Sequence, residues 1–353
     1  MSDRIKNIVQ TMLFVFVLLI VFLFNIIKED NIVSVAEKRK LQLMPDITFS
    51  SILDGRFSSE FDNYTIDQFF LREDLRKVTM TLDLNLKGEY HKLSIKDKYI
   101  YEKNLSTNIN SVNNFISKIN LLDEMYLNEK NKVYYTIIPD KNYFINNSYN
   151  DIHDSLIQNF TYKYIDIMSE LKLDDYYKTD QHWKQENIKL VAKKILESMG
   201  KEYVDDYEEV FVKKFSGTYG NQITIFNEKD TLKILTSDTL NSCLVYNYDL
   251  NKESLVYDFG NMNIDTYNIY LSGPVSIISI TNNLIDSNDE LIIFRDSFAS
   301  SLAPLLVNQY KKITLIDTRY ISPELIGEFI EIDNQDILFI YSTLIINNSY
   351  TLK

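Results

Sequence analysis

The sequence predicts an α/β fold: a three-layer α/β/α domain whose sheet is parallel and covered by helices on both faces. One observation is the run at 132–138, which is apolar and β-branched and ends in Pro139-Asp140, as a buried parallel strand does. The other is the alternation of strand and helix patterns towards the C-terminus, which requires right-handed crossovers between parallel strands. These alternating segments are expected at 291–294, 299–310, 313–316, 323–329 and 337–341.

Composition excludes some functions. The chain has 353 residues, of which 45% are hydrophobic and 25% charged, so it can bury a sizeable core. Its net charge of -13 argues against nucleic acid, because phosphate binding needs a basic surface, and small neutral or glycan substrates fit better. The single Cys243 cannot form an intrachain disulfide, and its strand-like surroundings indicate a buried, inert thiol.

The N-terminal segment predicts a membrane helix. Residues 8–27 form a run of 20 residues without a charge, long enough to cross a hydrocarbon layer of roughly 30 Å. No Ala-x-Ala pattern follows, which favours an uncleaved anchor over a signal peptide. Arg4 and Lys6 favour a cytoplasmic N-terminus, although the lysines after the run weaken the charge rule. The expected organisation is a cytoplasmic tip and anchor at 1–30, a juxtamembrane tether at 31–60 and a large domain at 61–353.

The remaining elements follow in order along the large domain. An amphipathic helix is expected at 61–80, a strand or hairpin at 93–101 and a helix at 152–171. In the next helix, at 185–199, the apolar residues fall on one face and Gly200 is placed as its C-terminal cap. Runs of Val, Ile and Tyr broken by Gly and Pro predict a β-rich insertion at about 203–285.

Candidate site residues follow the predicted strands. Ligands of parallel sheets bind beyond the carboxyl ends of the strands. Ser297, the pair at 140–141 and the group at 317–319 all occupy such positions, so we expect them to line one rim. Ser297 lies on a strand-to-helix turn that would expose its hydroxyl, although Asp296 or Ser297 could simply cap the following helix.

A second segment supplies the partners that a serine nucleophile needs. Of the three histidines, only His182 both follows an aspartate by two residues, Asp180, and adjoins the sole tryptophan, Trp183. Thr179 or Asp180 could instead be a plain helix cap. Both segments, however, lie at helix starts in an α/β pattern, and together they hold a nucleophile, a general base and an orienting carboxylate. This pairing favours a serine esterase-type site.

These residues resemble those of the DHHW proteins, which are akin to the alginate O-acetyltransferases of the SGNH hydrolase superfamily. The resemblance rests on Asp180, His182 and Trp183, on the later Asp-Ser-Phe segment at 296–298 and on the Asp-Thr-Arg segment at 317–319. The Ile-Pro-Asp-Lys segment at 138–141 and the stretch at 67–74 also look like that family. Gln181 departs from it, since the family's motif has a histidine there.

The resemblance implies a permuted SGNH fold in which the Asp and His segment precedes the serine segment. Ser297 would attack an acyl ester, His182 would act as general base and then acid, and Asp180 would orient the imidazole. Proteins of this kind look like extracytoplasmic acetyl carriers or transferases for polysaccharides. They often work with a multi-span membrane acyltransferase, which would be a partner and acetyl donor here.

Several residues are expected to support this chemistry. The Ser297 N–H is the first candidate for an oxyanion donor, and 217–221, including Asn221, or 282–283 could supply a second. Arg319 could anchor substrate or pair with Asp317, and we also place Trp183 and Lys141 among the binding residues. The sequence has no HExxH motif, cysteine cluster or glycine-rich phosphate loop, so neither a metal nor a cofactor is expected.

The leading hypothesis is a single-pass cell-membrane protein with an extracytoplasmic O-acetyltransferase domain. It would modify an exopolysaccharide or cell-wall glycan through an acyl-serine intermediate. A carbohydrate acetylesterase of SGNH type would use the same residues, because transfer and hydrolysis differ only in whether water reaches the acyl-enzyme. A non-catalytic glycan-binding or assembly protein is the third alternative, and the presence of all three triad residues counts against it.

Overall fold

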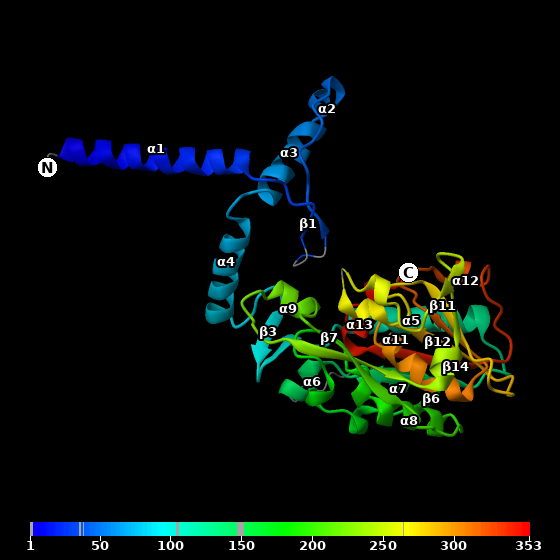
Figure 1. Ribbon diagram of the computed structural model, residues 1–353. Coiled ribbons are helices and arrows are strands. Elements are labelled where there is room, and N and C mark those ends of the chain that lie inside the picture. Colours follow the sequence, from blue (N-terminus) through cyan, green and yellow to red (C-terminus); the bar gives the residue numbers. More distant parts are fainter. Residues whose placement is uncertain (1–2, 35–36, 38, 104–105, 147–151, 264) are drawn as a thin grey trace. The chain divides into compact units, whose positions relative to one another are not determined.

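The computed structural model describes residues 3–34, 37, 39–103, 106–146, 152–263 and 265–353 (Figure 1). The chain divides into two compact units. One comprises Met1–Tyr90 and Asn221–Asn227, and the other comprises His91–Gly220 and Glu228–Lys353. The unit that holds the large sheet starts at His91. The predicted organisation into an anchor, a tether and a domain from about residue 61 stays a prediction.

The N-terminal unit carries the apolar segment as helix α1 (Asp3–Ile27), which is long and apolar enough to cross a membrane and has no buried residue among those described. The predicted helix at 61–80 is divided, because the chain leaves its helix after Asp67. There the Asp67 carboxylate accepts hydrogen bonds from the Arg39 guanidinium and from the Gln42 N–H. The other elements of this unit are β1 (Val33–Ser34), β2 (Arg39–Lys40), α2 (Phe49–Leu53), α3 (Arg56–Asp67) and α4 (Arg72–Leu86).

The second unit is built on an eight-stranded sheet of order β10-β9-β11-β13-β12-β14-β5-β6. Strands β13, β12, β14, β5 and β6 pair in parallel, and β11, β9 and β10 extend the sheet with antiparallel pairs. This arrangement confirms the predicted α/β class and shows that the sheet is mixed but mostly parallel. The strands are β5 (Val133–Ile138), β6 (Lys163–Tyr164), β9 (Leu244–Asn247), β10 (Lys252–Ser254), β11 (Ile277–Thr281), β12 (Glu290–Arg295), β13 (Lys312–Ile316) and β14 (Asp336–Ser342).

The sheet is buried on both faces. Alternate residues of β12 enter two different hydrophobic clusters: Leu291 and Ile293 join one, and Ile292 and Phe294 join the other. Helix α8 (Lys189–Ser198) contributes to the first cluster, whereas α5 (Ile109–Tyr126) and α7 (Ile152–Asn159) contribute to the second. Apolar residues on successive positions of β12 therefore pack on opposite faces, as in a layered α/β fold.

The β-rich segment at 203–285 is not a separate insertion, because three of its strands complete the main sheet. Its first part forms an antiparallel ribbon of β7 (Glu208–Phe215) and β8 (Asp230–Thr236). The hairpin predicted at 93–101 is present, and Gly200 has φ +76 after α8, as expected for a helix C-cap. The hairpin and the short helices of this unit are β3 (Leu93–Lys96), β4 (Tyr99–Glu102), α6 (Lys141–Asn146), α9 (Thr218–Gln222), α10 (Asp238–Ser242), α11 (Ala299–Leu302), α12 (Pro323–Ile326) and α13 (Thr343–Ile346).

Several helices are shorter than predicted. The segment at 152–171 is α-helical only to Asn159, after which the chain forms β6 and a 3-10 helix (Met168–Glu170). The segment at 299–310 forms a single α-helical turn and then a 3-10 helix (Ala303–Gln309), with Pro304 at its first turn. Proline removes a backbone donor, so the regular i→i−4 ladder cannot continue through this position.

Candidate active site

Ser297 lies in the turn between β12 and α11. The carboxylate of Asp296 fixes this turn, because it accepts hydrogen bonds from the N–H of Phe298 (3.0 Å) and from the N–H of Ser342 at the end of β14 (2.7 Å). Of the two residues that could have capped the helix after β12, Asp296 makes the capping contact and Ser297 does not. The serine hydroxyl is left available for another partner.

The carboxyl ends of the parallel strands meet at this edge of the sheet. Besides the Asp296 to Ser342 contact, the Thr343 hydroxyl donates to Asp140 beyond β5 (3.0 Å), and Arg295 lies 3.5 Å from Asp317 beyond β13. The three segments that the sequence placed on one rim are thus adjacent in the structure. Their carboxylates are buried, however, so they brace the strand ends and do not line an open surface.

His182 comes to Ser297 on a tight loop between residues 175 and 184. A hydrogen bond from the Tyr177 N–H to the His182 carbonyl (3.0 Å) and one from the Lys184 N–H to the Asp175 carbonyl (2.7 Å) close this loop. The histidine Nε2 lies 2.8 Å from the Ser297 Oγ, and its Nδ1 lies 2.6 Å from the Asp180 Oδ1. The side chains of Asp180, His182 and Ser297 are therefore joined in a continuous hydrogen-bonded chain.

The environment of Asp180 favours its charged form. The residue is fully buried, which acts to raise its pKa, but the electrostatic interaction with His182 and hydrogen bonds from His182 and the Thr218 N–H hold the pKa below its usual range. A carboxylate at Nδ1 keeps the proton on that nitrogen. The lone pair of Nε2 is then free to accept the Ser297 proton.

The loop that carries Asp180 is fixed by residues that no sequence motif indicated. The carboxylate of Asp230, on β8, accepts hydrogen bonds from the N–H of Lys178 (2.8 Å) and from the N–H and hydroxyl of Thr179 (2.7 and 2.6 Å). The N–H of Thr218 donates to the second oxygen of Asp180 (2.8 Å). Two elements distant in sequence therefore determine where the carboxylate lies.

Gly217 allows the close approach behind this loop. Its N–H donates to the Thr179 hydroxyl (2.8 Å), and a Cβ at this position would lie only 2.4 Å from the Asp180 Cβ and 2.7 Å from the Thr179 carbonyl. The Gly220 N–H donates to the same carbonyl (2.8 Å). The backbone donors of 217, 218 and 220 are thus committed to the loop, which removes them as candidates for a second oxyanion donor.

Lys141 lies beneath the loop and not on an open rim. It is 2% exposed, and its ammonium donates to the carbonyl oxygens of Ile100, Tyr177 (3.1 Å) and Asp180 (2.9 Å). Burial lowers its pKa to about 7, while the charges of nearby carboxylates, that of Asp180 first, oppose the shift. This geometry favours a positioning role for Lys141 over the substrate contact expected from the sequence.

Trp183 packs behind the nucleophile. The side chain is fully buried, and its indole N–H donates to the Phe298 carbonyl (3.1 Å) and the Ser301 hydroxyl (3.0 Å). It therefore holds the two catalytic segments together instead of contacting substrate, which corrects our expectation of a binding role. Tyr267, which the sequence did not indicate, stacks its ring on the His182 imidazole with centroids 3.7 Å apart and an interplanar angle of 4°.

The candidate oxyanion donors differ in whether they are already hydrogen-bonded. Among the described atoms, none accepts a hydrogen bond from the Ser297 N–H, so this donor is free. The amide of Asn282 is occupied by the Val307 carbonyl and the Leu284 N–H. Because β11 is antiparallel to β13, Asn282 and Asn283 lie at the opposite edge of the sheet from Ser297. Asn221 is grouped with the N-terminal unit, and its binding role stays a prediction.

Gln181 lies directly at the reaction centre. Its amide nitrogen is 3.4 Å from the His182 Nε2, the atom that also contacts the serine hydroxyl. In the neutral imidazole with a proton on Nδ1, a single Nε2 lone pair faces both donors. The residue that departs from the family's motif therefore competes with Ser297 for the general base.

Arg319 forms a two-point ion pair with Asp317. Its Nε and Nη2 lie 2.8 and 2.6 Å from the two carboxylate oxygens, and this pairing raises the pKa of the guanidinium against the opposing effect of burial. Of the two roles left open by the sequence, the structure thus shows the carboxylate pair. Arg295 lies 3.5 Å from the same carboxylate and is 1% exposed, and its burial lowers its pKa.

Comparison with solved structures identifies the fold. A DHHW family protein from Eubacterium siraeum matches with a TM-score of 0.60 and 18% identity, covering 73% of this chain and 92% of that chain. Bacillus cereus PatB1 matches with a TM-score of 0.58 and 20% identity over 72% and 96% of the two chains, and it has also been solved with a sulfonyl adduct. The O-acetyltransferase domain of Pseudomonas putida AlgJ aligns more loosely, at 9% identity and a TM-score of 0.46 over 72% and 92% of the two chains.

Neither a family model nor a curated protein matches the sequence. At these identities the likeness is one of fold, and it extends over most of each solved chain. The chain thus has the fold of the DHHW family protein and of PatB1, which confirms in three dimensions the resemblance found in its sequence.

Proposed function

We propose that this chain is a serine-dependent O-acetyltransferase that modifies a glycan outside the cytoplasm. The observation that carries the proposal is the hydrogen-bonded chain from the Asp180 carboxylate through His182 to the Ser297 hydroxyl, with distances of 2.6 and 2.8 Å. This is the arrangement that activates a hydroxyl as a nucleophile. The likeness of the fold to PatB1, for which a sulfonyl adduct is known, is consistent with it.

The proposed chemistry has two balanced halves. In the first, the Ser297 Oγ attacks the carbonyl carbon of an acetyl ester while His182 Nε2 takes the hydroxyl proton, and the free Ser297 N–H donates to the developing oxyanion. The donor's alcohol then leaves with the proton from His182, and acetyl-Ser297 remains. In the second, a glycan hydroxyl gives its proton to His182 and attacks the acyl carbon. The bond from this carbon to Ser297 Oγ then breaks, His182 returns the proton to Oγ, and the acetylated glycan is released.

The substrate and location follow from different observations. The net charge of -13 disfavours polyanionic nucleic acid and is compatible with a neutral glycan. Helix α1 would serve as the membrane anchor, with the enzyme domain on the extracytoplasmic side and a multi-span membrane acyltransferase as acetyl donor. The other residues at the carboxyl ends of the parallel strands stabilise the strand ends, and we assign none of them to substrate binding.

The test uses the full-length protein in detergent and a sulfonyl fluoride, whose sulfur a reactive serine attacks with loss of fluoride. We expect the modification to map to Ser297 by peptide mass spectrometry and to be absent in Ser297→Ala and strongly reduced in His182→Ala. Ser117→Ala and His153→Ala serve as controls, because these residues lie outside the catalytic segments, on helices α5 and α7. Labelling of other serines with Ser297 unmodified would contradict the proposal.

Turnover measurements distinguish an acetyltransferase from an esterase and from a non-catalytic binding protein. With 4-nitrophenyl acetate, Ser297→Ala and His182→Ala should lose at least ~100-fold in rate while remaining folded, as triad variants do. An increase in acetylated product when an oligosaccharide acceptor is added supports transfer, whereas release of acetate to water alone would show a carbohydrate acetylesterase. A wild-type protein that is no faster than the two folded variants would show a non-catalytic binding protein.

A further inference from the structure

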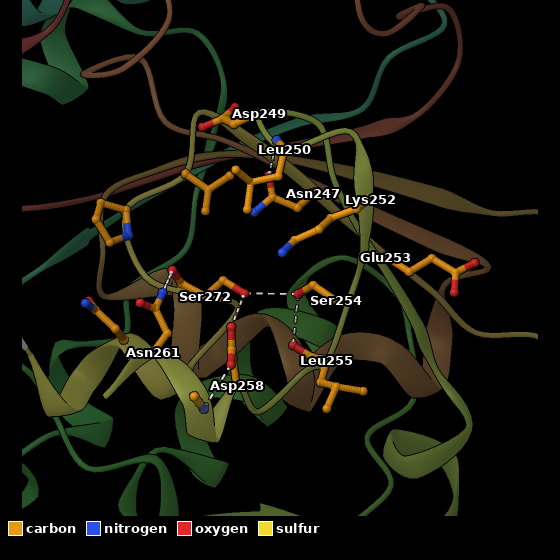
Figure 2. Close-up of a pocket in the computed structure, with 14 residues that line it drawn as sticks. Asn247, Asp249, Leu250, Lys252, Glu253, Ser254, Leu255, Asp258, Asn261 and Ser272 are labelled. Carbon is orange, nitrogen blue, oxygen red and sulfur yellow. Dashed lines mark hydrogen bonds between the residues drawn. The ribbon is translucent and has the colours of Figure 1, made fainter. Parts of the chain in front are cut away.

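A cavity lies outside the catalytic chain of Asp180, His182 and Ser297. It has a volume of about 690 Å³ and opens between the β9–β10 hairpin and the segment at 258–275 (Figure 2). This volume is within the range of roughly 300–1,000 Å³ that is usual for small-molecule sites. Its polar lining includes Asn247, Lys252, Ser254, Asp258, Asn268 and Ser272.

The floor of this cavity is an ordered polar network. The Ser272 hydroxyl donates to Asp258 Oδ2 (2.9 Å) and lies 3.0 Å from the Ser254 hydroxyl, and the Gly260 N–H donates to the other oxygen of Asp258 (3.1 Å). These contacts are drawn in Figure 2. Leu271 and Ser272 have φ values of +52 and +61, which side chains rarely adopt. Non-glycine residues in this conformation concentrate at functional sites, where the surrounding structure holds them.

Donors lie above this floor. Asn247 is 1% exposed, and its Oδ1 accepts the Leu250 N–H (3.1 Å), which turns its Nδ2 towards the cavity. Within the described part of the chain, this Nδ2 has no hydrogen-bond partner. Figure 2 also shows the Lys252 ammonium directed into the same space. The amide nitrogen of Asn247 is therefore a donor that the protein leaves open to the cavity, where the acceptor group of a ligand or a water can meet it.

The chemistry of the lining selects a class of ligand. Amide and ammonium donors face carboxylate and hydroxyl acceptors, a combination that suits vicinal hydroxyl groups, because each of these both donates and accepts. Asp258 lies on the floor, Asp249 accepts hydrogen bonds from Ser276 at the margin, and Glu253 extends away from the space (Figure 2). Together they give the lining three negative charges against the single positive charge of Lys252. This excess disfavours uronates, phosphates and other anions, and it favours a neutral or amino sugar.

A short 3-10 turn (Thr266–Ile269) connects the cavity to the catalytic chain. Asn268 lines the cavity, and the preceding residue, Tyr267, stacks on the His182 imidazole. The two sides of one turn thus contact the two sites. We propose that the cavity is a saccharide subsite, which holds neutral or amino-sugar units of the acceptor glycan while a neighbouring unit is presented to Ser297. This inference rests on the proposed function for the identity of the glycan as acceptor.

Binding is tested without turnover, in full-length Ser297→Ala in detergent. The probes are a neutral chitotetraose, its cationic de-N-acetylated form and an anionic oligogalacturonate of the same length, measured by calorimetry. Asn247→Asp keeps the acceptor for the Leu250 N–H but replaces the free donor with a charged acceptor. Asn251→Asp adds the same charge to the same hairpin outside the cavity lining and is the matched control.

We expect the neutral or cationic oligomer to bind, and Asn247→Asp to weaken binding of the neutral oligomer at least ~10-fold, because one hydrogen-bond donor is lost and a carboxylate oxygen then faces the sugar oxygen. Asn251→Asp should stay within about twofold of the parent. If Asn247→Asp does not fold, Lys252→Ala at the exposed rim replaces it, with the same direction expected for the neutral oligomer. In the active protein, the same cavity change should raise the KM for the oligosaccharide acceptor.

Three results would overturn the subsite: no binding of any oligomer, equal binding by Asn247→Asp and Asn251→Asp, or a preference for the anionic oligomer. Failure of the proposed function is distinguishable, because it shows as ester turnover that does not depend on Ser297. Sugar binding by the Ser297→Ala protein would stand in that case, and it would identify the chain as a glycan-binding protein.

Discussion

Replacing Lys141 by methionine tests how the catalytic loop is held. The substitution keeps most of the side-chain volume but leaves the carbonyls of Ile100, Tyr177 and Asp180 without their donor. Each unsatisfied buried acceptor costs about 1–3 kcal/mol, offset by relief from burying an ammonium. These opposing effects do not fix the sign of the change in the free energy of unfolding at a single pH. They do fix how that change varies with pH.

The sign follows from the two pKa values of the lysine. Its ordinary value is 10.5 and burial lowers the folded value to about 7, so between these pH values the unfolded chain binds the proton more tightly. The burial penalty is complete below pH 7 and is relieved as the pH rises towards 10.5. From pH 7 to pH 9, the wild-type free energy of unfolding should rise by about 2 kcal/mol relative to Lys141→Met.

The measurement is urea unfolding of the full-length protein in detergent at pH 6 to 9. Trp183 is the only tryptophan and is fully buried next to the loop, so its fluorescence reports unfolding of this unit. Lys130→Met is the control, because Lys130 is 65% exposed and pairs with Asp333 at the surface. A wild-type minus Lys141→Met difference that stays flat or falls between pH 7 and 9 would refute the reasoning.

Two further substitutions probe the same site. Gly217→Ala should lower kcat for the ester reporter at least ~10-fold, because the added Cβ would displace Asp180. Gly327→Ala is the control and should leave kcat unchanged, since its added Cβ would be 3.5 Å from the nearest neighbour. Equal rates for the two variants would contradict the role of Gly217. Tyr267→Phe preserves the ring on His182 and should retain most activity, whereas Tyr267→Leu should lose several-fold in kcat because the imidazole is no longer held by a stacked ring. Both variants are measured in single-turnover assays, and equal losses in the two would show that the hydroxyl matters and the ring does not.

Much of the site could be predicted because its chemistry depends on rare residues. With three histidines in the chain, the combination of Asp180, His182 and the adjoining Trp183 stood out, and the strand before Ser297 was apolar enough to locate its turn. The parallel strands could be predicted for the same reason, since fully buried strands are continuous apolar runs.

The contacts that hold the site could not be predicted, because they are made by common residues far apart in the sequence. Asp230 lies on an ordinary amphipathic strand, and Tyr267 is one of 25 tyrosines. Lys141 follows a strand, where a lysine is normally solvated, so its burial depended on carbonyls that only the folded loop supplies. The strands β9 to β11 were evident as strands, but local composition does not specify which sheet they join.

Both carboxylate oxygens of Asp180 accept hydrogen bonds. One oxygen faces the Nδ1 proton and the backbone N–H of His182, and the other faces the N–H of Thr218. An amide of the same shape would point its NH₂ group at one of these donors in either rotamer. The position therefore tolerates only an anion, and a chain carrying Asn there would have to rebuild the 217–218 turn before it could hold a working histidine.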